Sequence, residues 1–388
     1  MARNSEFYKG QRKKRNYAIL PGMILLLLFA LVIVLFYSTQ KYAVITDDGV
    51  KIELPLLTGG TIASDENVAG TADVSYDVAE GISIQFDEPL YEARIRPTAG
   101  RRSSSVKAIY IPYEDLSEES VYSYADRLST GNALLMNLKE KSGYLAWYSD
   151  TDTAYRYGLN MAAPDSKASL ENVIKTLKEK KVYLVAQISC CRDELLGAHS
   201  DQVCLRNLYG MYYSDADGYW LDPYSTIVRN YTVELVRELW DMGFDEVVLA
   251  DVRLPVAEPV DDGNGNKVSP FVYTMEMSTT PSNYGAVCGF AVHVAEELQD
   301  REKDKLLSIY LYTPPSLVGT DETTGQDGPL FMKMYDRIYY NTDKYTYSFN
   351  LQDMQPFVEI GNVKNRLVPV VQTYIPDNTS WVYIDIGE

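Results

Sequence analysis

The stretch Gly243-Phe-Asp-Glu-Val-Val-Leu-Ala-Asp-Val-Arg-Leu-Pro255 carries a clear strand signal within this chain of 388 residues. Residues 246–251 form a short run of β-branched and apolar side chains, which is typical of a β-strand. The preceding residues 226–242 are amphipathic with a helical period, which predicts a helix. This part of the sequence therefore predicts a helix followed directly by a strand.

The same alternation of helical and strand-like segments runs from residue 106 to the end of the chain. Amphipathic segments at 168–180 and 281–299 alternate with strand-like runs, and eight such repeats predict a (β/α)8 TIM barrel over residues 106–388. The alternative is a doubly wound open sheet, but no Gly-x-Gly-x-x-Gly turn of a dinucleotide fold is present, and we expect no cofactor. The other seven strand-like runs are 107–112, 133–138, 182–188, 306–312, 336–341, 367–373 and 381–385.

The N-terminal part of the sequence predicts a membrane anchor. Residues 17–37 contain no charge and, as a helix at about 1.5 Å per residue, would span the lipid bilayer. Residues 1–16 form a basic tail with Arg12-Lys13-Lys14-Arg15 at its end, so we expect the tail in the cytoplasm and the C-terminal domain outside the cell membrane. A cleaved signal peptide is the alternative, but the apolar run is long and no Ala-x-Ala-type site follows it.

Residues 38–105 predict a β-rich stalk or accessory segment. Two short alternating runs flank Asp48-Gly49, which is a strong hairpin signal, and another alternating run begins at Ile82.

The charge of the chain excludes some partners. The net charge is −18, and the residues after 37 carry 30 basic and 53 acidic side chains, which places this part near −23. Such a field repels nucleic acid and anionic lipid, and it suits neutral or cationic partners or simply solubility.

Cysteine and histidine give no sign of a catalytic or metal site. We expect Cys190, Cys191 and Cys204 to be small buried side chains, with one local disulfide as the alternative. The two histidines, His199 and His293, lack partners at the spacing of metal ligands, so we expect no histidine-based metal site and no histidine-dependent nucleophile.

The block from Gly243 to Pro255, together with several other segments, resembles the sequence pattern of a bacterial family of glycoside hydrolase barrels that is distantly similar to the alpha-amylase-type enzymes. The resemblance covers about residues 106–385, and its most specific part is the block from Gly243 to Pro255. The segments Trp220-Leu-Asp-Pro-Tyr224, Val182–Gln187 leading to Arg192-Asp193, Asn132–Lys139 with Gly143, and Gly325-Gln326-Asp327 also fit. The resemblance implies a TIM barrel that acts on a polysaccharide or a cell-envelope glycan.

This sequence departs from the family pattern at positions that matter for catalysis. Asn137 stands where the family has an Asp, and Gln187 stands where it has an Arg. The Asp of the family's fourth strand falls on Ala250, so that Asp251 takes the position of a Tyr. The resemblance therefore implies that two acidic groups of the family are missing here, at residues 137 and 250.

Glycoside hydrolysis needs two carboxyl groups, which in a barrel come from the C-terminal ends of strands. Asp251 is the first candidate because it ends a predicted strand and stands two residues before Arg253. A structural ion pair is the alternative, since alternation along the strand would turn residue 251 away from the barrel if residue 250 faces it. Asp193 and Asp222 are candidates for the second carboxylate, although Asp222 before Pro223 is also a common turn starter. Glu246 opens its strand, and we expect Asp245 and Glu246 at the barrel bottom.

Several other side chains are candidates for sugar binding. They are Arg253, Trp220, Asn137, Tyr340 and Gln372, with further tyrosines at 113, 148, 213 and 374 and Trp147 as stacking surfaces. For each tyrosine, packing against the core is the alternative.

Two functions follow from these observations. One is an envelope-anchored enzyme that cleaves polysaccharide with paired carboxylates. The other is a catalytically degenerate barrel that binds glycan or scaffolds envelope partners, which Asn137 and Ala250 favour. Retained Asp251, Asp222, Arg253 and Trp220 favour the enzyme.

Overall fold

The protein is described from a computed structural model. It describes residues 43–46, 49–52, 82–85 and 92–95, and residues 105–384 except 129–131, 162, 165–166, 217, 275–281, 303, 313–319, 342–362 and 373–379. The chain divides into two compact units, residues 1–75 and 76–388. Each unit is considered by itself.

In the first unit, β1 (Ala43–Thr46) pairs with β2 (Gly49–Ile52) in antiparallel register, with Thr46 opposite Gly49. The hairpin predicted around residues 48 and 49 is therefore present. The anchor predicted at residues 17–37 and the basic tail lie outside the described residues. Among the described residues, no helix has the length and apolar character needed to cross a membrane.

The second unit contains a closed barrel of eight parallel strands, as the sequence predicts, and this excludes the open sheet. The strands follow one another around the barrel in chain order, with β20 pairing β5 to close it. They are β5 (Lys107–Ile111), β6 (Ala133–Lys139), β7 (Tyr183–Ser189), β11 (Glu246–Ala250), β15 (Leu306–Leu311), β18 (Ile338–Asn341), β19 (Leu367–Val371) and β20 (Trp381–Tyr383). Each of the eight predicted runs overlaps one of these strands, and β6 and β7 each end one residue beyond the predicted run.

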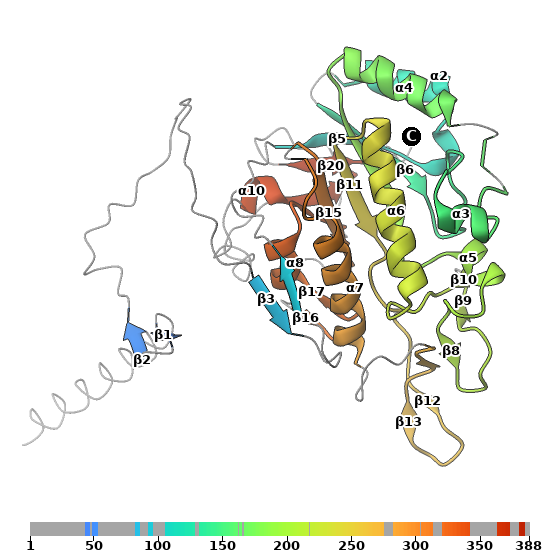
Figure 1. Cartoon of the computed structure of the whole chain (residues 1–388), viewed down its shortest axis with the longest axis vertical. Helices are drawn as coiled ribbons and strands as arrows, with labels where there is room; N and C mark the ends of the chain where they lie inside the picture. The colour runs from blue at the N-terminus through green and yellow to red at the C-terminus, as the bar shows by residue number, and fades with distance from the viewer. Residues whose placement is uncertain are drawn as a thin grey trace, which may run out of the picture. The chain divides into compact units, whose positions relative to one another are not determined.

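Helices alternate with the strands, and Figure 1 shows the longest of them, α6 and α7, lying across the barrel. The three helices expected from periodicity, α4, α6 and α7, are all present. The helices are η2 (Tyr113–Asp115, a 3-10 turn), α2 (Glu118–Asp126), α3 (Asp152–Arg156), α4 (Ala168–Glu179), α5 (Glu194–His199), α6 (Thr226–Met242), α7 (Asn283–Glu297), α8 (Gly328–Met334) and α10 (Val363–Arg366).

The first residues of the block from Gly243 to Pro255 form the tight connection between α6 and β11. Gly243 ends α6 with φ of +112°, a left-handed conformation that glycine adopts without a Cβ clash. Phe244 is fully buried behind it, and the carboxylate of Asp245 accepts a hydrogen bond of 2.8 Å from the backbone N–H of Leu184. These contacts turn the chain directly from α6 into β11.

Short antiparallel strand pairs lie outside the barrel in this unit. The hairpin of β3 (Ile82–Gln85) and β4 (Glu92–Ile95) lies beside α7, which explains why α7 is buried around most of its circumference. The remaining short strands are β8 (Arg206–Asn207), β9 (Ser214–Asp215), β10 (Gly218–Tyr219), β12 (Val260–Asp261), β13 (Lys267–Val268), β14 (Phe271–Val272), β16 (Thr320–Asp321) and β17 (Gln326–Asp327).

The lower interior of the barrel holds a buried polar cluster around Glu246. Its carboxylate accepts hydrogen bonds from the hydroxyls of Ser308 (2.6 Å), Tyr339 (2.9 Å) and Tyr183 (3.0 Å), and it is paired with the guanidinium of Arg337. Since Glu246 opens β11, this cluster lies at the end of the barrel where the strands begin. The expectation that Glu246 belongs to the barrel bottom is confirmed.

The four cysteines, at positions 190, 191, 204 and 288, are all buried and unbridged. The interpretation as small buried side chains is therefore confirmed, and no local disulfide forms among them. Burial raises the pKa of the Cys190 and Cys204 thiols to about 12. Both thiols therefore stay protonated near neutral pH and are inert as nucleophiles.

Candidate active site at the barrel mouth

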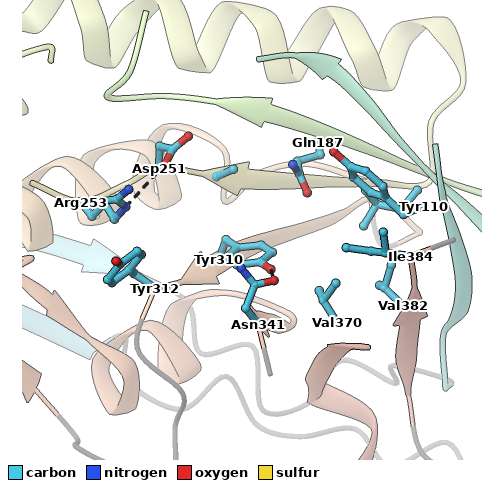
Figure 2. A pocket seen from close by; sticks show the side chains of 12 residues that line it. Tyr110, Gln187, Asp251, Arg253, Tyr310, Tyr312, Asn341, Val370, Val382 and Ile384 are labelled. Atoms are coloured by element: carbon cyan, nitrogen blue, oxygen red, sulfur yellow. Dashed lines mark hydrogen bonds and ion pairs between the residues drawn. The ribbon is translucent and has the colours of Figure 1, made fainter. Parts of the chain in front are cut away.

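A cavity of about 330 Å³ lies at the carboxyl ends of the barrel strands, where (β/α)8 enzymes carry out their chemistry. All eight strands, or the residues directly after them, contribute to it. The lining consists of Tyr110, Leu135, Gln187, Ala250, Asp251, Arg253, Tyr310, Tyr312, Asn341, Val370, Val382 and Ile384. Figure 2 shows these side chains around the cavity.

Asp251 faces this cavity because the backbone breaks the alternation of the strand. Glu246 lies inside the barrel and Ala250 lines the cavity, so regular alternation would turn residue 251 outward. Asp251 has φ of +52°, a left-handed conformation that is uncommon outside glycine, and its side chain lines the same cavity as Ala250. The local conformation thus brings a carboxylate to the barrel mouth directly after the end of β11.

Two donors hold the carboxylate of Asp251. Its Oδ2 accepts a hydrogen bond of 2.8 Å from the Ser189 hydroxyl at the end of β7, and its Oδ1 lies 3.6 Å from Nε of Arg253. The side chain of Asp251 remains 22% exposed. A ligand in the cavity can therefore reach a carboxylate whose orientation is already set.

Arg253 is oriented by aromatic rings. Its guanidinium carbon lies 4.7 Å from the ring centroid of Trp220 and 4.3 Å from that of Tyr312, both within the range of cation–π contacts. Burial lowers the pKa of Arg253, and the charge of Asp251 opposes that shift. The rings, Asp251 and the Leu254 carbonyl, which accepts a bond from Nη1, fix the position of this cation.

Hydroxyl and amide groups line the middle of the cavity. The hydroxyl of Tyr310 donates a short hydrogen bond to Oδ1 of Asn341, and Tyr110 is hydrogen-bonded to Asn137. Burial raises the pKa of Tyr110 to about 12 and that of Tyr310 further, so both hydroxyls keep their protons near neutral pH. Asn137 is not among the lining residues, and its contact with them is the hydrogen bond to Tyr110.

The other two candidate carboxylates are used by the loops around the barrel. Asp193 is fully buried, caps α5 through the Leu196 N–H (2.7 Å), and pairs with Lys139 at 2.9 Å. Asp222 is also fully buried, and it accepts hydrogen bonds from the backbone N–H groups of Tyr224 (2.9 Å) and Thr274 (2.6 Å). Neither residue lines the cavity, so Asp251 is its sole carboxylate in the part of the chain that the structure describes.

The aromatic candidates mostly lie in the core. Trp220 is 2% exposed, with the guanidinium groups of Arg192 and Arg253 over its ring, and Trp147 is fully buried with Nε1 donating to Glu238. Tyr340 is buried on the helix-facing side of β18. Trp220 therefore supports Arg253 rather than offering an open stacking face.

The remaining candidates are also outside the cavity lining. Gln372 is exposed just after β19, and residues 113, 148 and 213 are tyrosines on loops or in a 3-10 turn. Tyr374 lies outside the described residues. Tyr312, which is 51% exposed and lines the cavity, is the more accessible aromatic surface at the barrel mouth.

Sequence reasoning missed Tyr110, Tyr310, Tyr312 and Ser189 and gave Gln187 and Asn341 no leading role. A usable signal is present, because residues 310 and 312 are spaced by two at the end of a predicted strand and must share a face. No group of His, Cys, Asp and Glu residues able to hold a metal ion occurs among the described residues.

The fold and this site define the chain as a glycoside-hydrolase-like TIM barrel. A family model described as "Putative glycosyl hydrolase domain" matches residues 108–342, which is more than half of the chain, and the chain belongs to this family. The match begins in β5 and ends one residue after β18, so it includes nine of the lining residues, from Tyr110 to Asn341.

Solved structures are similar at low sequence identity. A hypothetical protein from Ruminiclostridium thermocellum is 20% identical over 52% of this chain and 96% of its own, with a TM-score of 0.42. Streptomyces plicatus N-acetyl-beta-hexosaminidase is 12% identical over 70% of this chain and 48% of its own, with a TM-score of 0.43. The GH36 alpha-galactosidase AgaA of Geobacillus stearothermophilus is 12% identical over 77% and 41%, with a TM-score of 0.45. The chain thus spans less than half of the two enzymes. No curated protein matches its sequence.

Proposed function

We propose that the protein is a glycoside hydrolase that acts on a polysaccharide at the barrel mouth, with Asp251 as a catalytic carboxylate. The observation that carries the proposal is the left-handed conformation of Asp251, which turns its carboxylate into the cavity. If side chains alternated regularly along the strand, Asp251 would face away from that cavity. Residues held in sparsely populated backbone conformations cluster at functional sites. Membership in the glycosyl hydrolase family supports the same substrate class.

The contacts of Asp251 suit a nucleophile or a general base. Its carboxylate accepts a hydrogen bond from the Ser189 hydroxyl and forms an ion pair with the Arg253 guanidinium. Both contacts favour the ionised form of the carboxylate. The hydroxyl of Tyr110 stays protonated and can donate to the sugar, whereas the hydroxyl hydrogen of Tyr310 is already donated to Asn341 and leaves Tyr310 only its oxygen as an acceptor. Glycoside hydrolysis by the usual route also needs a second carboxyl group as the acid.

A glycan-binding barrel without catalysis is the second candidate. It is favoured by Ala250 at the family's acidic position and by Asp251 being the lone carboxylate among the described lining residues. Both functions use the same cavity, so turnover distinguishes them.

The test is hydrolysis of envelope polysaccharides by the full chain in detergent micelles. Asp251→Asn should lower kcat by about 10²–10⁴-fold, because a positioned carboxylate contributes that much and an amide of the same shape does not replace it. Asp241→Asn, on the exposed surface of α6, is the matched control and should keep wild-type kcat. Undiminished turnover in Asp251→Asn would remove the catalytic assignment. Binding without turnover in the wild type would select the second candidate.

We also propose that residues 17–37 anchor the protein in the cell membrane, with residues 1–16 in the cytoplasm and the barrel outside. The uncharged 21-residue run and the basic cluster before it support this topology.

A further inference from the structure

The barrel-mouth cavity has two chemically different ends. Asp251 and Arg253 lie at one end, and Val370, Val382 and Ile384 lie at the other, as Figure 2 shows. Val370 and Val382 are directly paired residues of β19 and β20, and Ile384 follows by two residues on the same face as Val382. These three side chains form the apolar wall of the cavity.

An apolar wall is a poor partner for an unsubstituted sugar ring, which carries hydroxyl groups around its whole edge. A hydroxyl pressed against Val370 and Ile384 would lose its hydrogen bonds to water and gain none in return. An apolar substituent on the sugar would satisfy this wall while the hydroxyls face Asp251 and Arg253.

Two side-chain amides lie between these ends, Gln187 on β7 and Asn341 on β18. Because Oδ1 of Asn341 accepts the hydrogen bond of the Tyr310 hydroxyl, Nδ2 is the part of this amide that can donate to a ligand. Asn341 is exposed at the end of its strand, next to the residues of β19 that form the apolar wall. A ligand carbonyl close to a methyl group would meet a donor and an apolar surface together.

We propose that the cavity receives a sugar residue that carries an N-acetyl group. The acetyl methyl packs against the apolar wall, the acetyl carbonyl accepts a hydrogen bond from Asn341 Nδ2, and Gln187 can pair with the amide as donor or acceptor. This inference rests on the proposed function, since it assigns the substrate class of the same cavity. A 6-deoxy sugar shares the methyl group but lacks the amide.

Binding of monosaccharides to the full chain in detergent micelles, followed by saturation-transfer NMR, tests the proposal. N-acetylglucosamine and N-acetylgalactosamine should bind at least about tenfold more tightly than glucose and galactose, as expected for a fitted apolar contact. Their acetyl methyl protons should receive the strongest saturation. Equal binding of the unsubstituted sugars, or no binding of the acetylated ones, would overturn the proposal. Equal binding of fucose, a 6-deoxy sugar, would overturn the role of the amides.

Two variants sharpen the experiment. Ile384→Ser should weaken binding of the acetylated sugars by about tenfold, whereas Val256→Ser, at an exposed position outside the cavity, should leave it unchanged. Asn341→Asp keeps an acceptor for Tyr310 but replaces the amide donor by a carboxylate. It should therefore invert the preference and favour glucosamine, whose ammonium group replaces the N-acetyl group. Retention of the wild-type preference in both variants would contradict the assignment.

The outcomes separate this inference from the proposed function. Hydrolysis of polysaccharides without preference for N-acetylated sugars would overturn the inference and leave the hydrolase. Selective binding of the acetylated sugars without turnover of any glycan would retain the subsite and overturn the hydrolase.

Discussion

Ser189 occupies a key place beside the candidate carboxylate. Its Oγ lies 2.8 Å from Oδ2 of Asp251 and 2.9 Å from the backbone carbonyl oxygen of Arg192, and one hydroxyl hydrogen serves only one of these acceptors at a time. The backbone carbonyl of Ser189 also accepts a hydrogen bond of 2.6 Å from the buried Lys139 ammonium. Ser189 is therefore fixed in place, and under the proposed function it is a positioning residue for Asp251.

We expect Ser189→Ala to lower kcat/KM by about tenfold to a hundredfold, since a hydrogen bond to a charged group contributes about 1.5–3 kcal/mol. The effect should appear mainly in kcat, because the hydroxyl contacts Asp251 and not the cavity. Steady-state kinetics on the preferred polysaccharide measure it, and Ser123→Ala, at an exposed position of α2, serves as the control. Wild-type kcat/KM in Ser189→Ala would contradict the positioning role.

At the scale of elements, the strands form a barrel whose two ends have separate tasks. The end where the strands begin is closed by Glu246 and its three hydroxyl donors and guanidinium partner. The other end carries the cavity, and among the described residues all eight strands or the residues directly after them line it. The barrel bottom therefore supports the fold, while the barrel mouth is available to a ligand.

This division predicts unequal effects of two substitutions. Glu246→Leu should destabilise the protein by about 3–5 kcal/mol or more, because it leaves a buried cation and three hydroxyls without their acceptor. Arg337→Met should cost less, because Glu246 keeps its three hydroxyl donors. Urea denaturation followed by tryptophan fluorescence compares the two variants. Equal destabilisation, or a larger effect of Arg337→Met, would contradict this account of the barrel bottom.

The strands and the barrel were predictable from the sequence, whereas much of the site was not. Each strand lies in a short apolar run, which is rich in β-branched or aromatic residues in most cases but not in β6, and that local pattern is enough to locate it. The direction of Asp251 depends on one backbone angle, which no side-chain pattern encodes for an aspartate. The burial of Trp220 and Asp222 depends on a loop that folds back onto residues 191 and 203, a tertiary contact that the sequence does not display.

At the scale of the whole molecule, the anchor and the charge belong to one proposal. A basic tail before an uncharged run is what the positive-inside rule associates with an exported C-terminal domain, and the strongly acidic remainder is a separate feature of that domain. The net negative charge of the residues after 37 repels nucleic acid.

Limited proteolysis tests this topology. Protease added to intact cells whose outer layers have been removed should digest the chain from about residue 40 onward, because only the tail and the anchor would be shielded. A cytoplasmic protein monitored in the same cells should stay intact. Protection of the barrel, or a mature N-terminus near residue 38, would contradict the anchor.

The central claim is that a glycan binds at the barrel mouth beside Asp251. Hydrogen–deuterium exchange of the full chain in detergent micelles, with and without a panel of envelope polysaccharide fragments, tests it most directly. We expect slower exchange in peptides that contain residues 187–192, 250–254 and 310–312, because a bound sugar would restrict the strand ends that line the cavity. Protection confined to another surface, such as the exposed loop around Tyr209, or no protection by any glycan, would contradict the claim.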